Sequence, residues 1–295
     1  MSLIIFWLMP VVLLLVLILL VLPIIKPHRN GRLYVIEPLG WLVTTWQVAR
    51  FEPNTQSLAR LFKVLASSNL SKGTLLEQII VSAAGALRIK SQTTSATLIE
   101  HQSIGPLAER FVLEISTKTQ SVIVGPLEQI GSLVEDENMA KYRILSQKSA
   151  DHGYLALTIA TAFVHGDKPK RTKHRIEGLV VIEPKVAVDR AATLQKLGQD
   201  SVRFLSVAPV GFTRHLYQQI FPDQAPFGLD AKELETVLPP KFAEADLEKA
   251  VVVGGADIVA RHQALRTWQR RFDCVVVSIN PEDRDLPITP KTNII

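Results

Sequence analysis

Residues 250–279, AVVVGGADIVARHQALRTWQRRFDCVVVSI, contain a short apolar run, a mixed stretch of helical length and a second apolar run. This pattern predicts a strand at 250–253, a helix at 257–271 and a strand at 274–279. Two neighbouring strands joined by a helix run parallel, because the helical crossover returns the chain to the same end of the sheet. The stretch therefore predicts a parallel sheet with helices packed on its faces.

The same alternation of strands and helices extends back to residue 178. Strands are predicted at 178–182 and 202–207, and helices at 188–197, 213–221 and 230–237. Gly198 directly follows the first of these helices, which is typical of a helix end. Short apolar strands between helices indicate a parallel sheet that is covered on both faces.

Residues 33–175 show a mixed pattern that precedes this regular alternation. Strand character is predicted at 42–46, 110–116, 121–124 and 154–164, and helices at 57–66, 74–87, 127–134 and 139–150. The polar, basic stretch at 165–175 has the composition of a linker or an exposed loop. The sequence thus predicts an α+β segment followed by an α/β segment.

An uncharged apolar run occupies residues 3–25. As a helix it would reach about 34 Å, which is enough to cross a bilayer. A signal peptide is the alternative, but the run is long for one and has no charged segment before it. Lys26, His28, Arg29 and Arg32 follow the run, so we expect a single span with the N-terminus outside and the body in the cytoplasm of the cell.

Composition excludes some classes of protein. Cys274 is the single cysteine, so no internal disulfide can form. The formal net charge of +5 is mild for 295 residues and does not by itself indicate nucleic-acid binding. The sequence contains no phosphate-binding Gly-Lys-Ser/Thr loop and no His or Cys motif at metal-ligand spacing, so no cofactor or metal is expected.

Residues 36–40, Ile-Glu-Pro-Leu-Gly, lie soon after the apolar run, and distinctive segments follow at 122–128, 153–157, 178–185, 228–234 and 250–269. In order and spacing these segments resemble the cytoplasmic core of P-type ATPases. The resemblance implies a Rossmann-like parallel sheet of the haloacid-dehalogenase type, interrupted by an inserted α+β nucleotide-binding domain. It implies a phosphorylation-like domain at 33–59 and 176–290, an inserted domain at 60–175, and a transmembrane helix at 3–25.

The residues that carry chemistry in that family are changed here. The resemblance aligns Val48 with the phosphorylated Asp and Ala49 with the Lys beside it, and it aligns Pro209 with the end of a phosphate-binding segment. It aligns the late phosphate-contacting Lys with Arg261, or with His262 if the register slips by one residue. The metal-binding loop falls on 279–284, where Asn280 and Arg284 replace metal-compatible groups.

Other acidic residues and backbone amides are candidates to replace the missing groups. Glu37 precedes the expected catalytic turn, so its position is expected to exclude it as a substitute nucleophile. Asp283 and Asp285 could bind a cation, although solvated loop residues are the expected alternative. The amides of residues 254–256 could hold an anion at the start of a helix, and a tight turn between strand and helix is the favoured interpretation.

These changes predict a catalytically inactive P-type-ATPase-like protein that serves as a scaffold or accessory subunit of a membrane complex. The alternatives are a residual nucleotide-binding sensor, with Gly125 and Arg261 as weak nucleotide contacts, or part of a split cation-transporting ATPase. The expected partners are the lipid bilayer and another membrane subunit, with at most weak ATP binding and no nucleic acid.

Overall fold

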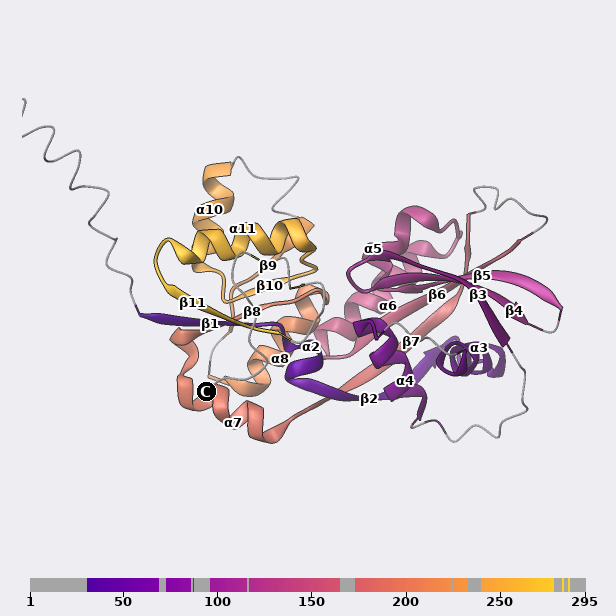
Figure 1. Ribbon diagram of the computed structural model, residues 1–295, viewed down its shortest axis with the longest axis horizontal. Helices are drawn as coiled ribbons and strands as arrows, with labels where there is room; N and C mark the ends of the chain where they lie inside the picture. Colours follow the sequence, from indigo (N-terminus) through magenta and orange to yellow (C-terminus); the bar gives the residue numbers. More distant parts are fainter. Residues whose placement is uncertain are drawn as a thin grey trace, which may run out of the picture.

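The computed structural model describes residues 31–68, 73–85, 87, 96–115, 117–164, 173–223, 225–232, 240–278, 283 and 286 (Figure 1). The membrane span predicted at 3–25 lies outside these residues, as do most of the basic stretch at 165–175 and most of the helix at 230–237. Within the described ranges, no helix is both long and apolar enough to cross a bilayer.

Five strands form an all-parallel sheet in the order β11–β1–β8–β10–β9. Tyr34 of β1 lies opposite Val275 of β11 on one side and Val202 of β8 on the other. This arrangement confirms the parallel sheet predicted from residues 202–279. The strands are β1 (Arg32–Ile36), β8 (Val202–Leu205), β9 (Gly228–Asp230), β10 (Val252–Gly254) and β11 (Asp273–Val277).

Helices cover both faces of the parallel sheet, as its apolar strands require. Leu33 and Val35 of β1 face the side on which Trp268 of α11 is buried. Ile36 faces the other side, where Phe212 of α8 packs. The helices are α7 (Val188–Leu197) and α8 (Val210–Ile220) on one face, and α10 (Pro240–Lys249) and α11 (Ile258–Gln269) on the other.

Six strands form a second, antiparallel sheet in the order β2–β7–β6–β5–β4–β3. Its strands are β2 (Val43–Glu52), β3 (Ala96–Gly105), β4 (Ala108–Ile115), β5 (Lys118–Gly125), β6 (Leu155–Phe163) and β7 (Arg175–Val186). One face packs on α3 (Gln56–Ser67) and α4 (Leu75–Gly85). The other packs on α5 (Leu127–Ile130), the 3-10 turn Gly131–Leu133 and α6 (Met139–Asp151).

The strand predicted at 178–182 does not belong to the parallel sheet. It is the middle of β7, which pairs antiparallel with both β2 and β6. The segment was assigned to the wrong sheet because a strand buried on both faces has the same apolar composition in either kind of sheet. Strands β1, β3 and β9 and helix α10 were not predicted.

The two sheets share one continuous apolar core. Trp46 of β2 stacks on Phe212 of α8, with ring centroids 6.1 Å apart and ring planes inclined by 20°. Because β7 pairs with β6 and β2 pairs with β7, segments from both sides of 60–175 belong to the same sheet as the strands inside it. Sheets alone do not define domains, and the division into 33–59 with 176–290 and 60–175 stays a prediction.

Candidate functional site

Polar side chains from four separate segments meet at the carboxyl edge of the parallel sheet. Glu37 follows β1, Ser206 follows β8, and Asp283 lies in the chain beyond β11. Arg261 reaches the same point from α11. We call these four residues the carboxyl-edge cluster. Open α/β sheets place ligand-binding groups in the crevice outside the carboxyl ends of their strands, so this cluster is the candidate site.

The Glu-Pro-Leu-Gly segment turns the chain so that Glu37 points back into the sheet edge. Glu37 precedes the single turn α2 (Pro38–Trp41), and its Oε1 accepts a hydrogen bond from the backbone N of Leu39 at 3.1 Å. Gly40 has a φ of 77°, which glycine adopts without the strain that a Cβ atom would cause. The local sequence therefore fixes the direction of the Glu37 side chain.

Every acceptor position of the Glu37 carboxylate is used. Besides Leu39, Oε1 accepts from the hydroxyl of Ser206 at 2.9 Å. Oε2 accepts from the backbone N of Val207 at 3.2 Å and from a terminal nitrogen of Arg261 at 2.8 Å. A carboxylate has about four lone-pair sites, so Glu37 has none left for a ligand. Its side chain is also inaccessible, since the residue is only 1 % exposed.

Arg261 is held between two buried carboxylates. Its other terminal nitrogen donates to Oδ2 of Asp283 at 2.7 Å, opposite the bond to Glu37. Arg261 lies in the first turns of α11, whose N-cap Asp257 accepts from the backbone N of Ala260 at 2.9 Å. Arg261 is 2 % exposed and Asp283 is fully buried. The guanidinium charge of Arg261 is therefore paired inside the protein and does not face solvent.

Burial raises the free energy of ionising the carboxyl groups of this cluster. It raises the pKa of Glu37 and the pKa of Asp283 above their ordinary values, and the charge of Arg261 opposes the shift at both carboxyls. The cluster contains two acids and one cation, so it carries one excess negative charge when both acids are ionised. Within the cluster, Nε of Arg261 and Oδ1 of Asp283 are buried without a hydrogen-bond partner.

The antiparallel sheet lies beyond the carboxyl edge of the parallel sheet (Figure 1). Gln129 of α5 accepts from the backbone N of Leu107, in the turn between β3 and β4, at 2.9 Å. Its side-chain nitrogen donates to the carbonyl of Val207 at 3.1 Å. Val207 is the residue whose amide holds Glu37. One glutamine thus ties the antiparallel sheet to the loop that contains part of the cluster.

The turn at 254–256 is a packing feature. The backbone N of Gly255 donates to the carbonyl of Ala208 at 2.6 Å, and the backbone N of Ala256 donates to the carbonyl of Ser206 at 2.9 Å. These amides are therefore occupied, as the tight-turn interpretation requires. A Cβ atom at Gly254 would lie 2.3 Å from Cα of Val210, so this position has no room for a side chain.

Two expectations about acidic residues were wrong. Geometry does not exclude Glu37, because β1 ends at Ile36 and delivers Glu37 directly to the carboxyl edge. Asp283 is not a solvated loop residue, because it is fully buried against Arg261. Val48 lies elsewhere, half-buried in β2 opposite Ile182 in the antiparallel sheet, and its neighbour Ala49 falls at a register shift in the same strand.

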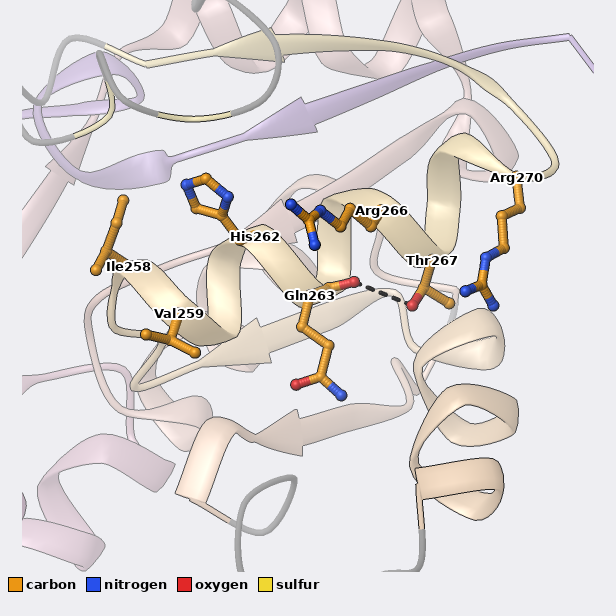
Figure 2. A pocket seen from close by; sticks show the side chains of 7 residues that line it. All are labelled: Ile258, Val259, His262, Gln263, Arg266, Thr267 and Arg270. Carbon is orange, nitrogen blue, oxygen red and sulfur yellow. Dashed lines mark hydrogen bonds between the residues drawn. The ribbon is translucent and has the colours of Figure 1, made fainter.

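The remaining predicted positions divide between the cluster and other places. Arg261 belongs to the cluster, whereas His262 lies on the outer side of α11 beside a groove of about 550 Å³ (Figure 2). Pro209 is the N-cap of α8, close after β8 at the carboxyl edge. Asn280, Arg284 and Asp285 lie outside the described residues.

Gly125 has a structural explanation. It ends β5, and a Cβ atom at this position would lie 2.7 Å from Cβ of Ala108 and 2.9 Å from the carbonyl oxygen of Leu107. Close packing of β5 on the β3–β4 turn therefore accounts for the glycine. Its assignment as a nucleotide contact stays a prediction.

Ser206 is the member of the cluster that the sequence analysis missed. It bonds to Glu37 and also accepts from the backbone N of Ala208 at 3.1 Å. A single hydroxyl at the end of a predicted parallel strand was the available signal. That signal became specific only when β1 was placed beside β8, because Glu37 and Ser206 are 169 residues apart in the sequence.

The described part of the chain contains no group of three or more His, Cys, Asp or Glu side chains arranged to hold a metal ion. Comparisons with protein-family models and with curated proteins found no match.

Proposed function

We propose that this chain is a membrane-anchored, non-catalytic relative of the P-type ATPase core that serves as a scaffold or accessory subunit of a membrane complex. The observation that carries the proposal is the internal pairing of the carboxyl-edge cluster, in which Arg261 forms ion pairs with both Glu37 and Asp283. The parallel sheet with helices on both faces is compatible with the haloacid-dehalogenase-type fold that the proposal requires.

Phosphoryl transfer through a covalent intermediate has requirements that this geometry does not meet. The nucleophile needs a free lone pair and access to the substrate, and cations must face the transferred group. Glu37 accepts four hydrogen bonds in a buried position. Both terminal nitrogens of Arg261 donate to the carboxylates of Glu37 and Asp283, so neither is available to a substrate. The cluster is thus suited to holding the sheet edge together and unsuited to receiving a phosphoryl group.

The contact between the two sheets also favours a scaffold. Catalytic cycles of multi-domain phosphotransferases require domains that open and close around the substrate. Here Trp46 and Phe212 belong to one buried core, and Gln129 bridges the two sheets by hydrogen bonds. A continuous apolar core resists hinge motion, because opening it would expose buried side chains to water.

The proposal is tested by purifying the full chain from native membranes in a mild detergent and identifying the proteins that accompany it. A membrane protein in constant stoichiometry, retained through a high-salt wash and gel filtration, is the expected result. Recovery of the chain alone, combined with an ATP-dependent rise in melting temperature, would contradict the scaffold reading and favour the nucleotide sensor.

A further inference from the structure

His174 holds the start of β7 against the chain that follows α5. Its backbone N donates to the carbonyl of Leu133 at 3.1 Å, and its own carbonyl accepts from the backbone N of Glu135 at 2.9 Å. These two bonds form an isolated parallel bridge between Val134 and His174. Lys173 lies 3.2 Å from Glu135, but both side chains are exposed, so this ion pair contributes little. We call residues 133–135 together with His174 the β7 clasp.

The side chain of His174 is buried against the antiparallel sheet. Its Nε2 lies 2.9 Å from the hydroxyl oxygen of Ser121 in β5. Nε of Arg110, in β4, donates to the same hydroxyl oxygen at 3.1 Å. His174 and Ser121 are both buried, so water does not separate the imidazole from the hydroxyl that contacts Arg110.

Hydrogen-bond directions make this arrangement sensitive to the protonation of His174. A guanidinium nitrogen only donates, so the hydroxyl of Ser121 accepts from Arg110. In the described part of the chain, Nε2 of His174 is the one acceptor within reach of the hydroxyl proton. Nε2 must then be unprotonated, because a protonated imidazole donates from both nitrogens. Protonation would leave the hydroxyl between two cationic donors and without its acceptor.

The charges around the imidazole act in the same direction. Burial, with the charge of Arg110, lowers the pKa of His174, and a backbone hydrogen bond with Leu133 opposes this shift. Glu135 pairs with Lys173 instead of with the imidazole. The elements next to His174 also carry Arg175, Asp136, Tyr142 and Glu177; Asp136 accepts from the backbone N of Asn138 and of Ile176, and Glu177 accepts from the hydroxyl of Thr161.

We propose that the β7 clasp is a pH-sensitive latch, which opens when His174 is protonated while the rest of the antiparallel sheet stays folded. Opening lets water solvate the imidazolium, and it breaks both backbone bonds of the clasp together because His174 makes both. The ladder between β7 and β6 begins at Arg175, opposite Thr161, so it does not require the clasp. This inference goes beyond the scaffold function and does not depend on it.

The test is hydrogen exchange of the full chain in detergent micelles between about pH 5 and 8, with each rate corrected for the intrinsic effect of pH. The amides of Glu135 and His174 report on the clasp, and the amides of β6 report on the sheet. We expect the protection factors of the clasp amides to be constant above pH 6.5 and to fall below it. The fall is at most about tenfold per pH unit, because opening takes up one proton. The amides of β6 should keep their protection.

Two variants assign the fall to the contacts of His174. His174→Gln removes the titrating group and keeps a side chain that forms hydrogen bonds, so the protection of the Glu135 amide should no longer depend on pH. Arg110→Met removes one cause of the lowered pKa of His174, so the fall should become smaller. The matched control is His101→Gln, which removes another histidine of the same sheet, bonded to Glu109 at 2.9 Å, and should leave the fall unchanged.

Protection of the clasp amides that does not change with pH in the native chain would overturn the inference without any variant. An equal fall for the amides of β6 would also overturn it, because the whole sheet and not the clasp would then open. A fall that persists in His174→Gln, or that disappears in His101→Gln, would assign the titration to a group other than His174.

Discussion

Replacing Arg261 by alanine removes the one cation between two buried carboxylates. Glu37 is 1 % exposed and Asp283 is fully buried, so water cannot solvate the charges that remain. Breaking a buried ion pair by deleting one partner costs about 3–5 kcal/mol of folding free energy. We expect a loss of this size in Arg261→Ala. The loss should shrink at acid pH, because the pKa of each remaining carboxyl rises and protonation removes the charge.

Urea unfolding of the full chain in detergent micelles measures this loss, followed by tryptophan fluorescence. Trp41, Trp46 and Trp268 are 3 %, 3 % and 1 % exposed, so their emission reports on the folded core. The control is Arg266→Ala, an exposed position one turn further along the same helix, where we expect a change within about 0.5 kcal/mol.

A triple variant separates charge from shape. Glu37→Gln, Arg261→Met and Asp283→Asn together leave a neutral cluster of similar volume. Replacing a buried ion cluster by well-packed apolar residues is often neutral, whereas the amides introduced here leave some hydrogen bonds unmade, so the triple variant should recover part of the loss. The reasoning is refuted if Arg261→Ala loses no more stability than Arg266→Ala, or if the triple variant loses more than Arg261→Ala alone.

Three further predictions concern single positions. Burial, with the charge of Arg110, lowers the pKa of His174, so its contribution to stability is complete above pH 6.5 and is lost as the pH falls through the lowered pKa. The urea midpoint of His174→Gln should therefore depend less on pH below 6.5, whereas an unchanged dependence would contradict the assignment. Burial raises the pKa of Tyr217 to about 12, so stability falls as the pH rises from 10 towards 12. Tyr217→Phe should reduce that fall in melting curves recorded at alkaline pH, and an unchanged fall would contradict this role of Tyr217. Gly254→Ala places a Cβ atom 2.3 Å from Cα of Val210 and should destabilise the fold by about 1–3 kcal/mol in urea titrations, and a neutral effect would show that the turn can move.

Local signals predicted the elements that local sequence controls. The helix predicted at 188–197 matches α7 end to end, and Gly198 follows it with a φ of 80° as a helix end requires. Strands β8, β10 and β11 were also found, because each is a short apolar run between amphipathic helices. Alternation of such runs was sufficient to predict the parallel sheet.

Strand partners were not accessible from local sequence. The short strand β1 merges with β2 in one aliphatic stretch, broken only by the turn at Gly40. Its neighbour β11 lies at the far end of the chain. A strand with the apolar composition of β7 fits a parallel and an antiparallel sheet equally well. Its orientation relative to the neighbouring strands could therefore not be predicted from the sequence.

The site depended on the same long-range information. Glu37 and Arg261 are separated by 224 residues, and their contact requires β1 to lie between β8 and β11. The family resemblance directed attention to Val48, which belongs to the antiparallel sheet. Arg261 was recognised as a position of interest, but its two carboxylate partners were not.

The most direct test of the central claim is incubation of the purified full chain with radiolabelled ATP and magnesium, followed by acid precipitation. We expect no acid-stable phosphate on the protein, because the lone pairs of Glu37 are saturated and the cluster is closed to solvent. An acid-stable phosphoprotein that forms in the native chain and is lost in Glu37→Gln would show that the carboxyl-edge cluster is a working phosphoryl acceptor, and the protein would then not be a non-catalytic scaffold.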